Sequence, residues 1–109
     1  MRIDFNTYEH TVVPEFKGGK GQLDGQMFVD SKGKILTGRL QPGYTVGLHT
    51  HDTSSEIIYV LSGTGYAIVD GQREDLQPGV CTYCPQGSSH ELICEGPEDL
   101  FFFAVVPEF

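Results

Sequence analysis

The sequence has little of several features that would narrow its function at once. It contains no tryptophan, and 7 basic residues stand against 15 acidic ones, which gives a formal net charge of −8. An acidic surface repels nucleic-acid phosphates and anionic lipid headgroups, so we expect neither nucleic acid nor a membrane as a partner. No apolar run approaches the roughly 20 residues of a membrane-spanning helix, and the start lacks the apolar region of a secretory signal. These absences predict a soluble, cytoplasmic protein.

Cysteine is scarce and odd in number, with only Cys81, Cys84 and Cys94. A disulfide framework in a secreted protein normally uses an even set. Cys81 and Cys84 have the C-x-x-C spacing of redox and zinc motifs, but they lie in a strand-like run, where residues three apart point to opposite faces. No second C-x-x-C exists. We therefore predict reduced cysteines that fill the core or a pocket.

Glycine and proline, by contrast, are frequent, and they separate short runs of β-branched, aromatic and aliphatic residues. Regular turn signals with no long 3.6-residue apolar period predict an all-β sandwich or barrel of a single domain. Asp70-Gly71 is a strong two-residue hairpin signal, because both central positions of a type I′ turn need positive φ. We expect strands at residues 26–29, 35–40, 45–50, 56–61, 65–69, 74–76, 80–84, 90–94 and 101–105.

The N-terminal part is less regular than the rest. Residues 1–24 show no clear alternation and predict an extended arm, which could pair with the sheet edge of a neighbouring subunit. We expect one domain, with an N-terminal arm and strands over residues 1–33 and a barrel over residues 34–109.

Two of the four histidines, His49 and His51, stand one residue apart, and Glu56 follows after four small polar residues. On a strand, residues two apart share a face, so both imidazoles can reach one ion. Residues 52–55 have the length of a hairpin loop, which would bring Glu56 onto the neighbouring strand. Ile58 and Val60 would then share the face of Glu56 and form apolar walls. A pair of exposed strand-end histidines explains the H-x-H spacing alone equally well.

The wider spacing of these residues resembles the two signature motifs of the cupin superfamily. The first motif is matched by Gly43, His49-x-His51, Glu56 and Gly63, which are separated by five, four and six residues. The second motif is matched by Gly79, Pro85-x-Gly87 and His90, which are separated by five and two residues. The resemblance spans about residues 34–106.

This resemblance implies a double-stranded β-helix, or jelly-roll barrel, of two antiparallel sheets around a pocket. It also implies that one divalent metal is bound by four side chains, namely His49, His51, Glu56 and His90. Three imidazoles and one carboxylate suit Mn, Fe, Co, Ni, Cu or Zn and disfavour Ca or Mg. Small cupins are often dimers, so a homodimer is expected by the same analogy.

The sequence departs from the second motif where Cys94 stands in place of the usual asparagine, four residues after His90; the only asparagine is Asn6. Cys94 shares the parity of His90, so it would lie near the pocket or in the core. Two further residues could contact a ligand: Tyr44 as a hydroxyl donor and Arg39 as a clamp for a carboxylate. Surface or core packing explains each of them equally well.

The motifs suggest a function without fixing one, because the same barrel supports several activities. Our first hypothesis is a metal-dependent enzyme acting on a small organic molecule, of oxygenase, decarboxylase or isomerase type. The alternative is a non-catalytic module that binds a small ligand or the metal itself.

Overall fold

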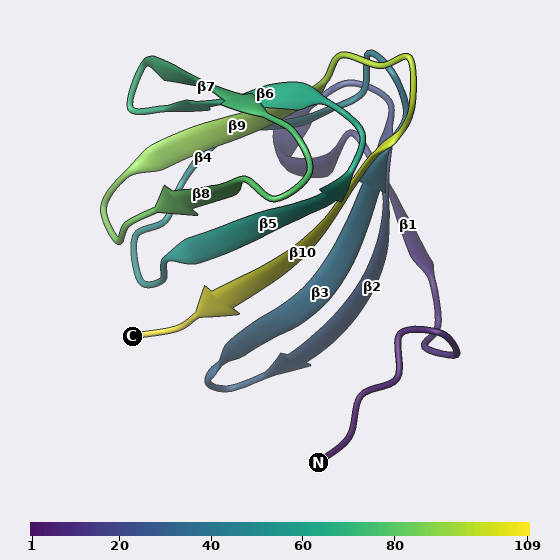
Figure 1. Cartoon of the computed structure of the whole chain (residues 1–109). Helices are drawn as coiled ribbons and strands as arrows, with labels where there is room; N and C mark the ends of the chain where they lie inside the picture. The colour runs from purple at the N-terminus through teal and green to yellow at the C-terminus, as the bar shows by residue number, and fades with distance from the viewer.

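The structure, a computed structural model that describes residues 1–109, consists almost entirely of β-strands (Figure 1). A six-stranded antiparallel sheet in the order β1-β2-β3-β10-β5-β8 faces a four-stranded sheet in the order β4-β9-β6-β7. The expected all-β jelly roll is confirmed, and no helix is long and apolar enough to cross a membrane. The strands are β1 (Thr11–Pro14), β2 (Gln22–Asp30), β3 (Gly33–Leu40), β4 (Thr45–Thr50), β5 (Glu56–Ser62), β6 (Gly65–Val69), β7 (Gln72–Leu76), β8 (Cys81–Cys84), β9 (Ser89–Cys94) and β10 (Leu100–Pro107).

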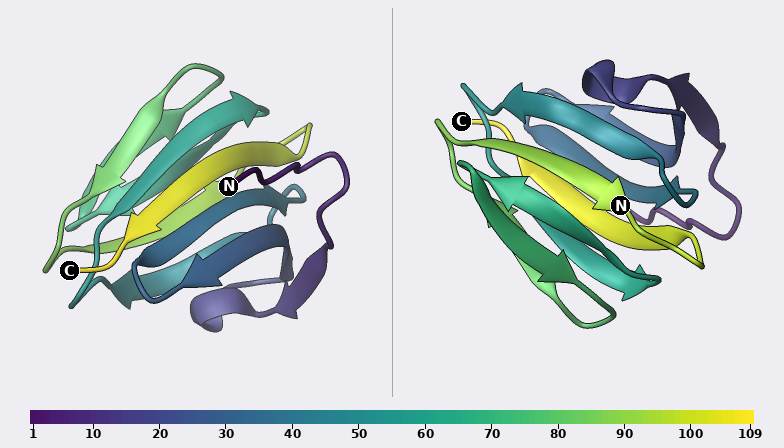
Figure 2. Two further views of the ribbon diagram at one scale, coloured as in Figure 1. Left: turned by 90° about the horizontal axis from the view of Figure 1, so that it is seen from below. Right: turned by 90° about the horizontal axis from the view of Figure 1, so that it is seen from above.

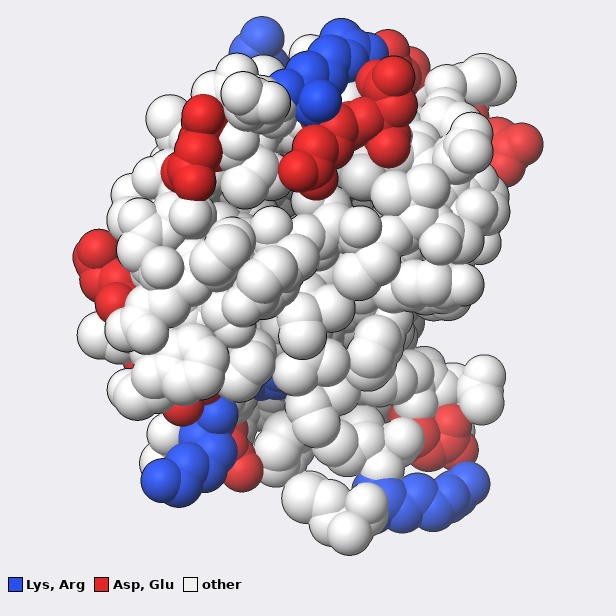
Figure 3. Space-filling model, turned by 60° about the vertical axis from the view of Figure 1, so that its left-hand side comes forward, with Lys and Arg blue, Asp and Glu red and all other residues white.

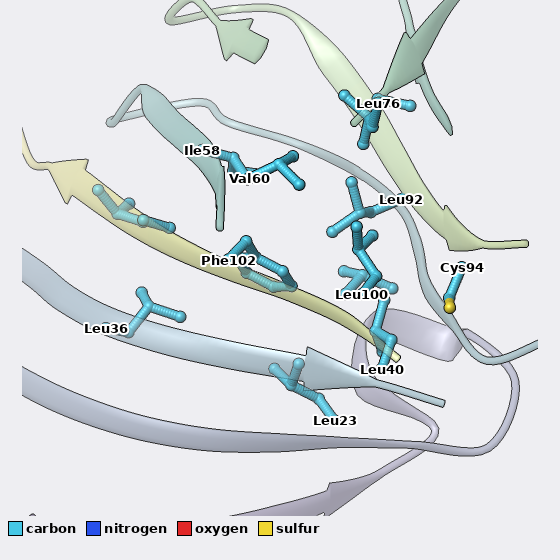
Figure 4. Packing of buried hydrophobic residues seen from close by; sticks show 14 residues of the cluster. Leu23, Leu36, Leu40, Ile58, Val60, Leu76, Leu92, Cys94, Leu100 and Phe102 are labelled. Atoms are coloured by element: carbon cyan, nitrogen blue, oxygen red, sulfur yellow. The ribbon is translucent and has the colours of Figure 1, made fainter. Parts of the chain in front are cut away.

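The core lies between the two sheets because the inner-facing residues of nearly every strand are apolar. Along β10, burial alternates strictly, with Leu100, Phe102, Ala104 and Val106 buried. Figure 4 shows Phe102 between inner-facing side chains of the neighbouring strands, with Leu92 of the opposite sheet nearby. Views along the sheets show the two layers curving around this interior (Figure 2).

Local sequence signals placed most strands correctly. β4 and β6 have the predicted bounds, and the turn between β6 and β7 is the predicted hairpin. Asp70 and Gly71 have φ values of 49° and 80°, between the paired residues Val69 and Gln72. This backbone conformation is the one that a type I′ turn requires.

The N-terminal segment belongs to the same barrel. β1 was not predicted as a strand, and it pairs with β2 of its own chain from Thr11 opposite Gly25 to Pro14 opposite Gln22. Because β1 is the edge strand of the sheet, its other side is unpaired in the single chain, and pairing with a neighbouring subunit stays a prediction. The short 3-10 helix η1 (Phe16–Gly18) then packs on β4 so closely that a Cβ at Gly47 would overlap the Lys17 carbonyl.

The three cysteines are free, and they occupy different environments. Cys84 and Cys94 are buried as predicted, but Cys81 is exposed on the outer face of β8. The prediction that all three fill the core or pocket is wrong for Cys81, because strand alternation turns it away from Cys84. Burial, followed by the nearby Glu56 charge, raises the pKa of the Cys84 thiol to about 11 and keeps it protonated.

Candidate metal centre

Four side chains converge at one end of the barrel, on the inner face. Their ligand atoms all lie within 4.8 Å of one another. The Nε2 atom of His90 is 3.0 Å from that of His51 and 3.2 Å from that of His49. Glu56 Oε1 is 3.1 Å from His51 Nε2 and 3.0 Å from His90 Nε2. His49, His51, Glu56 and His90 therefore form one compact cluster.

The backbone assembles this cluster differently from the predicted hairpin. His49 pairs with His90 across β4 and β9, in the four-stranded sheet. His51 lies just beyond the end of β4, and the chain then crosses to the other sheet, where Glu56 begins β5. The prediction that Glu56 lies on the strand beside the histidines is wrong, because β4 and β5 belong to different sheets. The cluster thus draws its ligands from both sheets.

Hydrogen bonds on the far side of two imidazoles orient the rings. His49 Nδ1 donates to the Gly47 carbonyl at 2.7 Å, and a β-bulge between Val46 and His49 lies at the same place. His51 Nδ1 lies 2.7 Å from Ser54 Oγ. Because His49 carries its proton on Nδ1, its Nε2 lone pair faces the centre of the cluster.

The cluster fits a divalent transition metal on its own geometry. Ligands about 2.0–2.1 Å from an ion lie roughly 2.8–3.4 Å from their nearest neighbours, with octahedral arrangements at the short end and tetrahedral ones at the long end. The contacts of 3.0–3.2 Å between Nε2 and Oε1 atoms match that spacing. Lone pairs that converge so closely are mutually repulsive unless a cation or proton lies between them. Nitrogen-rich coordination with one carboxylate favours Mn, Fe, Co, Ni, Cu or Zn.

The electrostatics of the cluster keep its carboxylate charged. Burial alone would raise the pKa of Glu56, but hydrogen bonds from His51 and His90 outweigh it and lower the pKa to about 2. Burial lowers the pKa of His49, which the hydrogen bond to the Gly47 carbonyl only partly offsets. A neutral imidazole beside a charged carboxylate is the state that ligates a metal.

A cavity of about 250 Å³ opens beside the cluster. Its wall contains all four cluster residues together with apolar side chains from both sheets. Ile58, predicted as a pocket wall, lines it, and Figure 4 shows Ile58 and Phe102 on neighbouring strands of one sheet. The main apolar lining residues are Phe16, Leu23, Met27, Leu36, Val46, Ile58, Leu92, Phe102 and Val106.

The other predicted pocket residues lie outside this lining. Val60 is fully buried in the core, and Cys94 is buried with its thiol 3.4 Å from the Glu98 carbonyl. Tyr44 packs against the edge of the core. Arg39 faces outward, because the inner face of β3 carries the even-numbered residues, and its guanidinium lies over the Phe101 ring.

Sequence reasoning missed the wall that β2 and β3 contribute. Met27 and Leu36 are paired across these strands and line the cavity. Each has only one polar neighbour along the chain, since Phe28 follows Met27 and Ile35 precedes Leu36, so simple alternation does not single them out. The sequence also does not show which face of the sheet Met27 and Leu36 occupy, because that depends on the pairing of β3 with β10.

A jelly roll of two sheets, with three histidines and a glutamate at one end, defines a class of small barrels suited to one divalent metal. The chain belongs to the cupin family: the family model described as "Cupin domain" matches residues 36–106. The oxalate-binding protein of Thermotoga maritima is 30% identical over 100 residues, covering 86% of this chain and 83% of that protein.

Solved structures show the same fold over the full chain. A crystal structure described as a predicted oxalate decarboxylase from Thermotoga maritima superposes with a TM-score of 0.93 and 27% identity, covering 100% of both chains. The cupin domain of Schizosaccharomyces pombe Cnp3 has a TM-score of 0.82 at 8% identity, covering 100% of this chain and 74% of that one. The second likeness concerns the fold alone.

Metal retention should depend on pH through the histidines. Protonation of an imidazole removes a ligand, and the ordinary histidine pKa is about 6.5. Because the pKa of His49 is lowered, its imidazole stays neutral to lower pH than an exposed one. The lowered pKa of Glu56 keeps its carboxylate charged until the pH falls through about 2. The stability that this charge gives is fully present above the ordinary pKa of 4.5 and is lost progressively as the pH falls from there through about 2.

We therefore expect full metal content near pH 7 and its loss well below pH ~6.5, while Glu56 is still ionised. Elemental analysis after dialysis across a pH series would measure this. Undiminished metal at pH ~4 would contradict ligation by imidazoles.

Proposed function

We propose that this protein holds one divalent transition metal with His49, His51, Glu56 and His90 and binds a small carboxylate at that metal. The observation that carries the proposal is the convergence of their ligand atoms within 4.8 Å, beside an open cavity. A bound metal with free coordination positions supplies Lewis acidity toward a carboxylate or carbonyl oxygen. The chain supplies three imidazole nitrogens, one carboxylate and apolar walls that exclude water.

The names of the Thermotoga maritima matches support the ligand class, since the curated sequence is called an oxalate-binding protein and the crystal structure is described as a predicted oxalate decarboxylase. We propose that the protein is a metal-dependent enzyme of decarboxylase, oxygenase or isomerase type. A non-catalytic binding role is the second candidate, which the binding function in the first relative's name favours.

Calorimetry with oxalate, on metal-free and metal-loaded protein, tests the proposal. We expect binding only in the metal-loaded form. Incubation of the loaded protein with oxalate and with keto acids, followed by product analysis, separates the two candidates. Recovery of unchanged ligand from a fully loaded protein would favour the binding role, and absence of metal-dependent binding to any carboxylate would refute both.

We also propose that two copies form a homodimer through the outer face of the six-stranded sheet. Ile57, Tyr59 and Leu61 on β5 are 39–44% exposed, and Tyr83 on β8 is 52% exposed opposite Ile57. Figure 3 shows a broad uncharged part of the surface between charged groups at its top and bottom. Copies with a charge of −8 repel one another, so association requires such an uncharged face.

Light scattering should report a dimer for the natural sequence and a monomer for Tyr59→Asp, because a buried unpaired carboxylate is costly. Leu48→Asp is the matched control, since Leu48 is 63% exposed on β4 in the other sheet. A monomeric natural protein, or an unchanged Tyr59→Asp dimer, would contradict this interface.

Cytoplasmic location remains a proposal. The free thiols of Cys81, Cys84 and Cys94 support it, because reducing compartments keep cysteines in this state. Fractionation of the cells that produce the protein would test it.

A further inference from the structure

Lys34 occupies an inward-facing position of the six-stranded sheet, where a cation is unexpected. It shares its face of β3 with Leu36, which is 6% exposed, and both residues line the cavity. Lys34 itself is only partly exposed. It takes part in none of the ion pairs of the structure. An amine facing a cavity with no carboxylate partner is available to an anionic ligand.

The strand register places Lys34 in line with the metal ligand Glu56. Lys34 is paired with Val106 on β10. The adjacent Val105 is paired with Ile57 on β5, so Val106 stands opposite Glu56 in the same register. Two strand spacings therefore separate the Lys34 and Glu56 backbones, or roughly 10 Å. The start of β3, the end of β10 and the start of β5 all lie at the same end of the barrel, on the left in Figure 1.

The surface between these two groups is apolar. Val106 lies between them, and the next inner-facing row of the same strands is Leu36, Ala104 and Ile58. A cavity of about 250 Å³ with such a floor holds more than a two-carbon acid. The metal cluster and Lys34 thus lie on either side of an apolar surface. Three other carboxylates, those of Asp52, Glu91 and Glu108, also line the cavity, and none of them forms an ion pair with Lys34.

We propose that Lys34 is a specificity-determining residue that binds the second carboxylate of a dicarboxylate whose first carboxylate lies on the metal. The ligand class is a dicarboxylate with an apolar spacer, of the glutarate or adipate type. This inference rests on the proposed function, because it takes metal-bound carboxylate as its starting point. Lys17 also lines the cavity, but it is exposed and its ammonium lies over the Phe16 ring, 5.5 Å from the centroid.

The test is calorimetry on Zn²⁺-loaded protein with glutarate, adipate, oxalate and the monocarboxylate pentanoate. We expect glutarate or adipate to bind more tightly than pentanoate. Lys34→Met removes the charge and keeps most of the length of the side chain. It should weaken glutarate and adipate binding by about tenfold or more and change pentanoate and oxalate binding by less than about twofold. Lys34→Arg should keep most of the dicarboxylate preference, since it keeps the charge.

Lys32→Met is the matched control, because Lys32 is an exposed lysine of the β2–β3 turn, just before β3, and does not line the cavity. Zinc content and melting temperature of each variant establish that the fold and the metal are intact. Three results would overturn the inference and leave metal-dependent carboxylate binding in place. They are an equal loss of dicarboxylate affinity in Lys34→Met and Lys32→Met, a loss of that affinity only in Lys17→Met, and no preference of the natural protein for the longer dicarboxylates. Failure of every carboxylate to bind in the presence of zinc would overturn both.

Discussion

His90→Ala should yield a folded barrel that retains little or no metal. His90 is 3% exposed, and its Nε2 atom lies 3.0–3.2 Å from three other ligand atoms. Neither His49 nor Glu56 makes as many contacts of this length in the cluster. Loss of an outer-shell partner alone typically costs about 10–100-fold in metal affinity, and loss of a direct ligand should cost more. Elemental analysis of protein purified without an affinity tag measures the effect.

His10→Ala is the matched control for this variant. His10 is the only histidine outside the cluster. Its side chain is 60% exposed, and its Nδ1 atom lies 2.8 Å from Asp24 Oδ1. Added metal should raise the melting temperature of the natural protein and of His10→Ala, because an ion that binds only the folded state stabilises it by about 2.7 kcal/mol at 100 times its dissociation constant. His90→Ala should show no such rise. Equal metal content in both variants would refute the four-residue metal centre.

Phe102→Ala should lower the free energy of unfolding by about 3–5 kcal/mol, the usual cost of removing a buried aromatic ring. Phe102 is 2% exposed, packs over Gly38 and forms part of the cavity wall. Its removal therefore enlarges the space into which the ligand fits. Urea unfolding of the metal-free proteins separates this packing effect from any change in metal binding.

The neighbouring Phe103→Ala provides the comparison. Phe103 faces the opposite side of β10, where it is half-buried and its ring meets that of Phe5 at 6.3 Å. It should lose less stability than Phe102→Ala, because less apolar area leaves the protein interior. Similar losses for the two variants would contradict the strict alternation of β10.

Local chemistry in the sequence was enough to predict most strands, whereas the four residues that meet at the cluster followed from the resemblance to the two cupin motifs. Asp70-Gly71 specified its hairpin, because few residue pairs tolerate positive φ at both positions. Residue parity could also have placed Arg39 on the outer face, opposite to the side chains of Leu36 and Leu40. These features depend on the chemistry of a few adjacent residues.

The errors concern contacts between distant parts of the chain. The loop after His51 has the length of a hairpin loop, yet it changes sheets, because β5 pairs with β8 and β10 instead of β4. β1 lacked a recognisable pattern because it is a short edge strand with little burial. The position of Lys34 opposite Val106 likewise depends on strand pairing, which no single stretch of sequence reveals.

Because His49 and His90 come from one sheet and Glu56 from the other, a bound ion would cross-link the two sheets at the open end of the barrel. The sheets could then separate there only after the ion had left. Amide protons near the starts of β5 and β9 should thus exchange more slowly in metal-loaded protein than in metal-free protein. The local stability of this end of the barrel would then depend on the concentration of available metal.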